Sequence, residues 1–232
     1  MTQPVTLAEF MADMPRLHYW GNPPVWRRGG FTEALLKELH AFMQARLPAE
    51  PEILETGAGN STIFFLLSRP KRLVSIDPND SIHERIDAYC TSRGIRHEAY
   101  ESYNASSDAV LPQLAAQWPK CFDFALIDGN HGWPAVFVDF CYTLQLLRRG
   151  GFIAIDDTRL HSVAELVRLL DAQPGFRRAL DLSKLVVFEK VTEATRMPEW
   201  SGQPYIVSRS KSTRATKAIR AMRRAARAFT GR

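Results

Sequence analysis

Apolar segments of strand length alternate with amphipathic segments of helix length along residues 52–191, and this alternation constrains the fold more than any other feature. Short apolar runs between turn residues predict buried strands, whereas apolar residues spaced by three and four predict helices. The pattern is typical of a mostly parallel sheet with helices on both faces. A tight turn joins the last two strands, so we expect the last strand to be antiparallel. We predict a Rossmann-like α/β fold whose seven strands cover residues 52–55, 72–77, 95–100, 122–129, 151–157, 176–182 and 184–191.

Helices are expected before and between these strands. The first has Thr32 as its N-cap and a core face that includes Leu35, Leu36 and Leu39. Ligands of such sheets bind at the carboxyl ends of the strands, so we expect functional residues in the loops that follow them. The predicted helices cover residues 32–47, 62–68, 81–93, 109–117, 134–149 and 162–172.

Charge is divided unevenly along the chain. The formal net charge is +5, but residues 208–232 hold nine of the 30 Lys and Arg residues and no Asp or Glu, which leaves 21 basic against 25 acidic residues elsewhere. A mildly acidic body argues against a general affinity for nucleic acid. We divide the chain into an N-terminal arm or lid (1–31), an α/β domain (32–191) and a C-terminal extension with a basic tail (192–232).

The basic tail leaves three roles open. It could stay solvated and partly disordered, rest weakly on an anionic membrane surface, or bind nucleic acid nonspecifically. No RNA-binding motif indicates a specific nucleic-acid partner. The longest apolar runs are too short to cross a bilayer, and the first residues lack the pattern of a signal peptide. Three widely spaced cysteines predict neither disulfides nor a zinc site, so we expect a cytoplasmic protein, at most peripheral to the inner membrane surface.

A glycine turn follows the first predicted strand. Gly57 and Gly59 lie between Glu55, at the strand end, and Ser61, at the start of a helix. Glycine lets the backbone turn tightly and approach a ligand, which then faces the N–H groups of the helix N-terminus. Asp77 ends the second strand, where a carboxylate can accept hydrogen bonds from both hydroxyls of a ribose. A turn that only connects strand to helix is the simpler alternative, but the two acids favour a nucleoside site.

The third glycine of a dinucleotide fingerprint is absent from "GAGNST", which disfavours NAD. The pattern resembles motif I of class I S-adenosylmethionine-dependent methyltransferases, and the resemblance covers residues 52–191. It implies S-adenosylmethionine as cofactor, with Glu55, Gly57, Gly59, Ser61 and Asp77 among the residues that bind it. By the same resemblance, Ser107 and Asp108 are candidates to border the adenine. They could equally cap the helix expected from residue 109.

Acidic residues end the fourth and fifth strands, which are neighbours in this architecture. Asp128, Asp156 and Asp157 are therefore expected to converge beside the methyl donor. Three carboxylates raise one another's pKa unless a cation lies among them. An all-oxygen set suits a hard divalent ion such as Mg²⁺.

The segment from "DFALIDGNH" to "IDDT" resembles a methyltransferase subfamily that includes metal-dependent O-methyltransferases of sugars and vicinal diols. The resemblance implies that Asp128, Asp156 and Asp157 bind the metal, that Asp128 also lies at the cofactor, and that His131 is the base. The acceptor would be a hydroxylated small molecule or glycan precursor. His161 is a second candidate for the base. Asp157 has the alternative role of capping the segment that leads to the next helix, without binding a metal. A metal-independent transferase and a non-catalytic cofactor-binding or RNA-binding module are the alternatives.

The N-terminal segment is rich in aromatic, Pro and Gly residues. Tyr19, Trp20 and Trp26 could form a lid over the substrate. The segment could instead be an arm that packs on the sheet or on a second subunit. Trp133, close to His131, is a further candidate to line the pocket.

Overall fold

The computed structural model describes residues 4–23 and 25–210, and the side chains of Trp20 and Asp80 are not among those described. The chain consists of two compact units, the first ending at Met197 and the second beginning at Pro198. The described part of the second unit contains a short 3₁₀ helix, η1 (Trp200–Gly202), and α8 (Pro204–Arg209). The predicted roles of the basic tail fall mostly on residues 211–232, outside the described residues. Within the described residues, no helix is long and apolar enough to cross a membrane.

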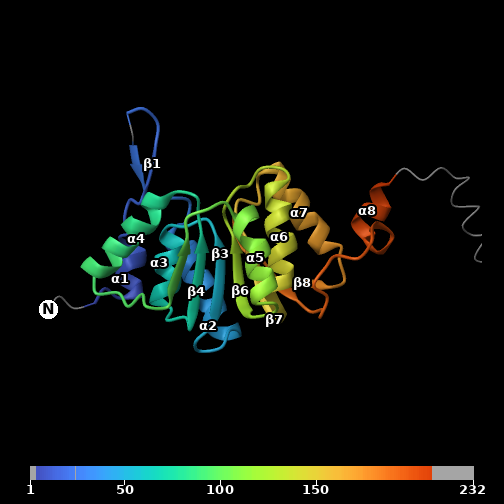
Figure 1. The fold of residues 1–232 in the computed structure, drawn as a ribbon, viewed down its shortest axis with the longest axis horizontal. Coiled ribbons are helices and arrows are strands. Elements are labelled where there is room, and N and C mark those ends of the chain that lie inside the picture. The colour runs from blue at the N-terminus through green and yellow to red at the C-terminus, as the bar shows by residue number, and fades with distance from the viewer. Residues whose placement is uncertain (1–3, 24, 211–232) are drawn as a thin grey trace, which may run out of the picture. The chain divides into compact units, whose positions relative to one another are not determined.

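A seven-stranded sheet forms the centre of the first unit, with strand order β5-β4-β3-β6-β7-β9-β8 (Figure 1). Strands β3 to β7 of this sheet run parallel, and β9 pairs antiparallel with both of its neighbours. The predicted α/β fold, the seven strands and the antiparallel last strand are therefore confirmed. The strands are β3 (Glu52–Thr56), β4 (Arg72–Ile76), β5 (Tyr100–Tyr103), β6 (Phe122–Ile127), β7 (Leu147–Ile155), β8 (Phe176–Asp181) and β9 (Val186–Lys190).

The central strands end level with one another, and this positions the site. Thr56, the last residue of β3, pairs with Ile76 of β4 and with Ile127 of β6, and Ile127 pairs with Ile155 of β7. All six residues of β6 are buried, as expected of a strand covered on both faces. The next residues of all four strands therefore emerge at one edge of the sheet.

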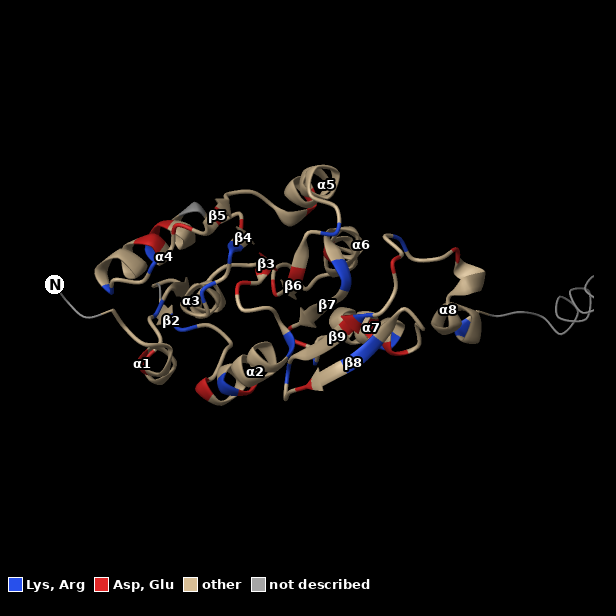
Figure 2. Ribbon diagram, turned by 90° about the horizontal axis from the view of Figure 1, so that it is seen from below, with Lys and Arg blue, Asp and Glu red and all other residues tan. Residues whose placement is uncertain are grey.

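Helices cover both faces of the sheet, with α2 on one side and α5 and α6 on the other (Figure 2). Thr32 caps α2 as predicted, because its hydroxyl accepts a hydrogen bond from the Leu35 N–H. Side chains of α1, α2 and α3 share one apolar core with residues of the central strands. The helices of this unit are α1 (Leu7–Ala12), α2 (Glu33–Arg46), α3 (Asn60–Leu67), α4 (Asp80–Ser92), α5 (Ser107–Gln117), α6 (Ala135–Leu146) and α7 (His161–Asp171).

Two predicted boundaries are wrong. The third strand begins at Tyr100 rather than at residue 95, because Ile95 donates to Cys90 O at the end of α4 and the chain then turns at His97. The fifth predicted helix ends at Leu146, three residues early, and β7 begins at the next residue. There the buried ammonium of Lys190 donates to the carbonyls of Leu144 and Leu147, and so terminates the helix.

The N-terminal segment is anchored to the domain. Phe10, Met11, Leu17 and Phe31 are buried in the core cluster. Between them lies a two-stranded antiparallel hairpin, β1 (His18–Trp20) and β2 (Val25–Arg27), whose strand β1 projects from the body in Figure 1. The segment therefore packs on the domain as an arm.

Candidate active site

The glycine turn between β3 and α3 needs glycine at one position above all. Gly57 has φ +84°, and a Cβ there would lie 2.4 Å from the carbonyl oxygen of Asp128. Gly129 lies opposite, and a Cβ on it would be 3.3 Å from the Gly57 nitrogen. The two glycines thus allow the loops after β3 and β6 to touch, which joins the predicted cofactor turn to the predicted acidic cluster.

Glu55 lies beneath this turn. Its carboxylate is fully buried and accepts hydrogen bonds from the hydroxyls of Ser61, at 2.9 Å, and Thr62. Burial raises the pKa of Glu55 to about 7, against the opposing effect of hydrogen bonds from Thr62, Ser75 and Ser61. Since the carboxylate has no exposed surface, Glu55 shapes the turn through the first residues of α3.

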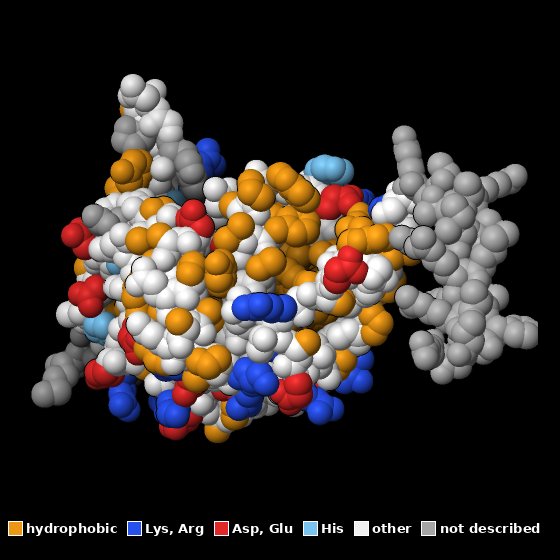
Figure 3. Space-filling model, turned by 45° about the vertical axis from the view of Figure 1, so that its right-hand side comes forward, with side chains coloured by type: hydrophobic (Ala, Val, Ile, Leu, Met, Phe, Trp, Pro, Cys, Tyr) orange, Lys and Arg blue, Asp and Glu red, His pale blue; other side chains and the backbone are white. Residues whose placement is uncertain are grey.

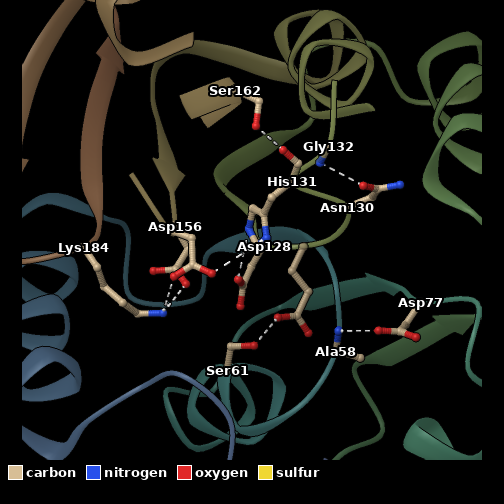
Figure 4. A network of polar contacts seen from close by, with 12 residues as sticks. Ala58, Ser61, Asp77, Asp128, Asn130, His131, Gly132, Asp156, Ser162 and Lys184 are labelled. Atoms are coloured by element: carbon tan, nitrogen blue, oxygen red, sulfur yellow. Dashed lines mark hydrogen bonds and ion pairs between the residues drawn. The ribbon is translucent and has the colours of Figure 1, made fainter. Parts of the chain in front are cut away.

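Asp77 follows β4 and supports the other side of the turn. Its carboxylate accepts from the Ala58 N–H at 3.1 Å (Figure 4) and from the Asn79 N–H at 2.8 Å. The carboxylate is therefore oriented toward the glycine turn.

A cavity of about 780 Å³ lies at the carboxyl ends of the strands, within the usual size range of small-molecule sites. It is lined by His131 and by every residue predicted to bind the cofactor or the metal except Glu55. A second groove, of about 450 Å³ along α6, has no acid or histidine among its described lining residues. Figure 3 shows one face of the molecule, across which many hydrophobic side chains are exposed. The cavity is lined by the predicted residues Gly57, Gly59, Ser61, Asp77, Ser107, Asp108, Asp128, His131, Asp156 and Asp157.

His131 lies in the loop after β6, and its ring is placed between two acids. Its Nε2 lies 3.5 Å from Asp128 Oδ1, and its Nδ1 lies 3.8 Å from Asp157 Oδ2 (Figure 4). The Ser162 hydroxyl donates to the His131 carbonyl and so holds the loop against α7. His161, by contrast, is exposed at the start of α7 and does not line the cavity. Of these two histidines, only His131 lines the cavity.

The two acids that follow β7 share a lysine. The Lys184 ammonium, from the turn between β8 and β9, donates to Asp156 and to Asp157 Oδ1, the latter at 3.1 Å (Figure 4). Burial acts to lower the pKa of Lys184, but the hydrogen bond and charge of Asp156 and the charge of Asp128 raise it above its ordinary value. Burial and the neighbouring Asp156 carboxylate raise the pKa of Asp128 well above its usual range.

The predicted divalent site does not fit this arrangement. Within the described residues, no group of three or more His, Cys, Asp or Glu side chains is arranged to hold a metal ion. Of the three predicted ligands, Asp156 and Asp157 already bind the Lys184 ammonium. In the segment that leads from Asp157 to α7, the Leu160 N–H donates to the Asp157 carbonyl at 2.9 Å, and Leu160 is the N-cap residue of the helix.

The start of α5 decides against one alternative for Ser107 and Asp108, the helix cap. Helix α5 begins at Ser107 with Ser106 as its N-cap residue, so Ser107 and Asp108 are not the cap. Asp139 of α6, which the sequence analysis missed, is buried in the cavity wall. Burial raises the pKa of Asp139, although the hydroxyls of Ser107 and Thr56 act to lower it. Its only signal in the sequence is an acid within the otherwise apolar segment 135–146.

The N-terminal arm closes one side of the cavity through Arg28, Gly29, Gly30 and Phe31. The side-chain amide of Asn60, in the first turn of α3, donates to the carbonyls of Pro15 and Arg28 and so ties the arm to the glycine turn. Of the predicted aromatic contacts, Tyr19, Trp26 and Trp133 are exposed and do not line the cavity, and the side chain of Trp20 is outside the described ones. The arm contributes His18 and residues 28–31 to the cavity wall instead.

Comparisons with known proteins agree with this architecture. Residues 54–158 match a family model described as a methyltransferase domain. The O-methyltransferase TomG of Streptomyces achromogenes, involved in tomaymycin synthesis and solved with S-adenosylmethionine, has a TM-score of 0.58 at 20% identity over 70% of this chain and 82% of its own. An O-methyltransferase from Bacillus cereus, solved with S-adenosylhomocysteine, has a TM-score of 0.56 at 19% identity over 69% and 83% of the two chains.

An rRNA methylase from Streptococcus thermophilus has a TM-score of 0.50 at 20% identity over 67% of this chain and 95% of its own. No curated protein sequence matches the chain significantly. At these identities the solved structures show the fold, and the residues that carry the glycine turn and the acids are similar to a methyltransferase domain.

Proposed function

We propose that this protein is an S-adenosylmethionine-dependent O-methyltransferase of a hydroxylated small molecule or glycan precursor, with His131 as the base. The Rossmann-like fold and the match of residues 54–158 to a methyltransferase domain support this proposal. One observation carries the proposal: a single cavity joins a nucleoside-type turn, built on Gly57 and Asp77, to an acid–base pair, His131 and Asp128. The described relatives that are O-methyltransferases support the same reaction.

The cofactor half of the cavity suits S-adenosylmethionine. Gly57 and Gly59 permit close approach of the backbone, and the N-terminus of α3 presents its N–H groups. The Asp77 carboxylate is positioned to accept hydrogen bonds from the ribose hydroxyls. Ser107 and Asp108, at the start of α5, border the adenine side. Glu55 acts indirectly, because it fixes the hydroxyls of the first helical turn.

The acid–base half suits a hydroxyl acceptor. S-adenosylmethionine supplies an electrophilic methyl group when bound. His131 Nε2 takes the proton of the acceptor hydroxyl, and its proximity to the Asp128 and Asp157 carboxylates stabilises the imidazolium that forms. The domain then contributes mainly by positioning, with the reacting atoms about 3–3.5 Å apart. The N-terminal arm, at residues 28–31, walls one side of the cavity.

Transfer of radiolabelled methyl groups to a panel of catechols, flavonoids and sugars tests the proposal. We expect the label on an oxygen of the acceptor, and a loss of about 100-fold or more in rate for His131→Ala, the usual contribution of general base catalysis. His161→Ala is the matched control and should retain the wild-type rate. Methylation of nitrogen or carbon, or full activity of His131→Ala, would contradict the assignment.

A further inference from the structure

The acidic cluster of the cavity already contains a cation. The Lys184 ammonium binds Asp156 and Asp157, and the Asp128 carboxylate lies close enough to Asp156 to raise its own pKa. The Asp156 side chain is 1% exposed and that of Lys184 is 18% exposed, so water screens this pair weakly. Sequence separations of 28 and 27 residues show that the fold, not local sequence, brings these groups together.

The N-terminal arm encloses the same ammonium from the other side. A Cβ on Gly30 would lie 2.5 Å from Lys184 Nζ, so a side chain there would displace the ammonium from its present position. The Phe31 ring centroid lies 5.1 Å from Nζ, within the range of a cation–π contact. Lys184 is therefore held in place by acids, backbone and an aromatic ring, as a built part of the cavity wall.

We propose that the Lys184 ammonium takes the position that a divalent cation would occupy among Asp128, Asp156 and Asp157, so that this site needs no metal. The proposal rests on the proposed function and assigns Lys184 a role in it. An ammonium has three N–H donors, and Asp156 and Asp157 accept two of them. The third donates to an oxygen of the acceptor.

The charges of the step balance without a metal. His131 takes the proton of the acceptor hydroxyl, and the oxygen forms its bond to the methyl carbon while the carbon–sulfur bond breaks with its electron pair going to sulfur. Lys184 keeps its three protons throughout. It offsets the negative charge that develops on the acceptor oxygen, as a metal ion would with twice the charge. The acceptor class this favours is a hydroxylated molecule without a requirement for chelation.

Binding of Mn²⁺, followed by electron paramagnetic resonance in the absence of any acceptor, tests the proposal. Wild type, Lys184→Arg and the surface control Lys37→Met should bind Mn²⁺ only weakly at the cavity. Lys37 pairs with Glu33 on α2, so its removal changes the charge equally and leaves the cavity intact. Lys184→Met removes the internal cation and should bind Mn²⁺ at least tenfold more tightly than wild type. If this variant does not fold, Lys184→Gln takes its place with the same expected result. Adding Asp156→Asn should abolish the gain.

Stoichiometric Mn²⁺ binding by wild type would overturn the proposal. So would Lys184→Met and Lys184→Gln variants that are folded by circular dichroism yet gain no affinity for Mn²⁺. S-adenosylmethionine binding to wild type is measured separately. If wild type does not bind S-adenosylmethionine, the proposed function is rejected. The comparison of Mn²⁺ binding between wild type and the Lys184 variants still tests the role of Lys184 in that case.

Discussion

Replacing Gly57 by alanine tests the contact that joins the two halves of the cavity. The new Cβ would lie 2.4 Å from the Asp128 carbonyl oxygen, well inside ordinary contact. Neither partner moves easily, because the Gly57 N–H donates to Ile76 O at 2.8 Å and the Asp128 N–H donates to Thr56 O at 3.0 Å. A substitution here must therefore break backbone hydrogen bonds at the end of the sheet or separate the two loops.

Gly150→Ala provides a matched control. Gly150 has φ +78°, nearly that of Gly57, but a Cβ there meets nothing within 4 Å. Its replacement costs only the left-handed backbone conformation, about 1–2 kcal/mol. Gly57→Ala adds an overpacking cost of about 1–3 kcal/mol, for a total loss of about 2–5 kcal/mol in the free energy of unfolding.

Urea denaturation measures both losses, and calorimetric titration with S-adenosylmethionine measures the effect on the site. We expect Gly150→Ala to bind like wild type and Gly57→Ala to bind at least tenfold more weakly, a difference of about 1.4 kcal/mol. Equal losses of stability in the two variants, with unchanged affinity in both, would refute the claim that the two loops meet at Gly57.

Two further perturbations follow from the contacts around the turn. Glu55 has a folded pKa of about 7 against 4.5 for the ordinary group, so the folded state binds more protons than the unfolded state between these values. The contribution of Glu55 to the free energy of unfolding is therefore fully present below pH 4.5 and is lost as the pH rises through 7. In urea titrations, the free energy of unfolding of wild type relative to Glu55→Gln should fall by about 3 kcal/mol between these pH values. A difference between the two proteins that does not change with pH would contradict the assignment. Asn60→Ala removes two hydrogen bonds, to the carbonyls of Pro15 and Arg28. The free energy of local opening of the arm should fall by about 1 kcal/mol or more, so trypsin should cleave after Arg28 several-fold faster. An unchanged cleavage rate would show that apolar contacts alone hold the arm.

The sequence was most informative where the controlling interactions are local. The apolar run of β6 and the glycine turn after β3 determine their own conformation, so the fold class and the edge that bears Gly57, Asp77 and Asp128 could be predicted. The third strand was misplaced because Ile95 is apolar yet packs at the end of α4, before pairing begins at Tyr100.

Residues controlled by distant contacts escaped the sequence analysis. Lys184 looked like the start of a strand, since its acidic partners are far away in the chain. The divalent site was predicted from three converging acids without knowledge of the ammonium among them. Asp139 was hidden in an apolar helix, where its proximity to the hydroxyls of Ser107 and Thr56 could not be inferred.

The central claim is that the cavity at the carboxyl ends of the strands binds S-adenosylmethionine, and calorimetric titration of wild type, Asp77→Ala and Asp87→Ala tests it most directly. Asp87 lies on α4, away from the cavity, where it pairs with His97. We predict saturable binding to wild type and Asp87→Ala, and an affinity at least tenfold lower for Asp77→Ala, since hydrogen bonds to a charged group contribute about 1.5–3 kcal/mol. Undiminished binding by Asp77→Ala, or no binding by wild type, would contradict the account.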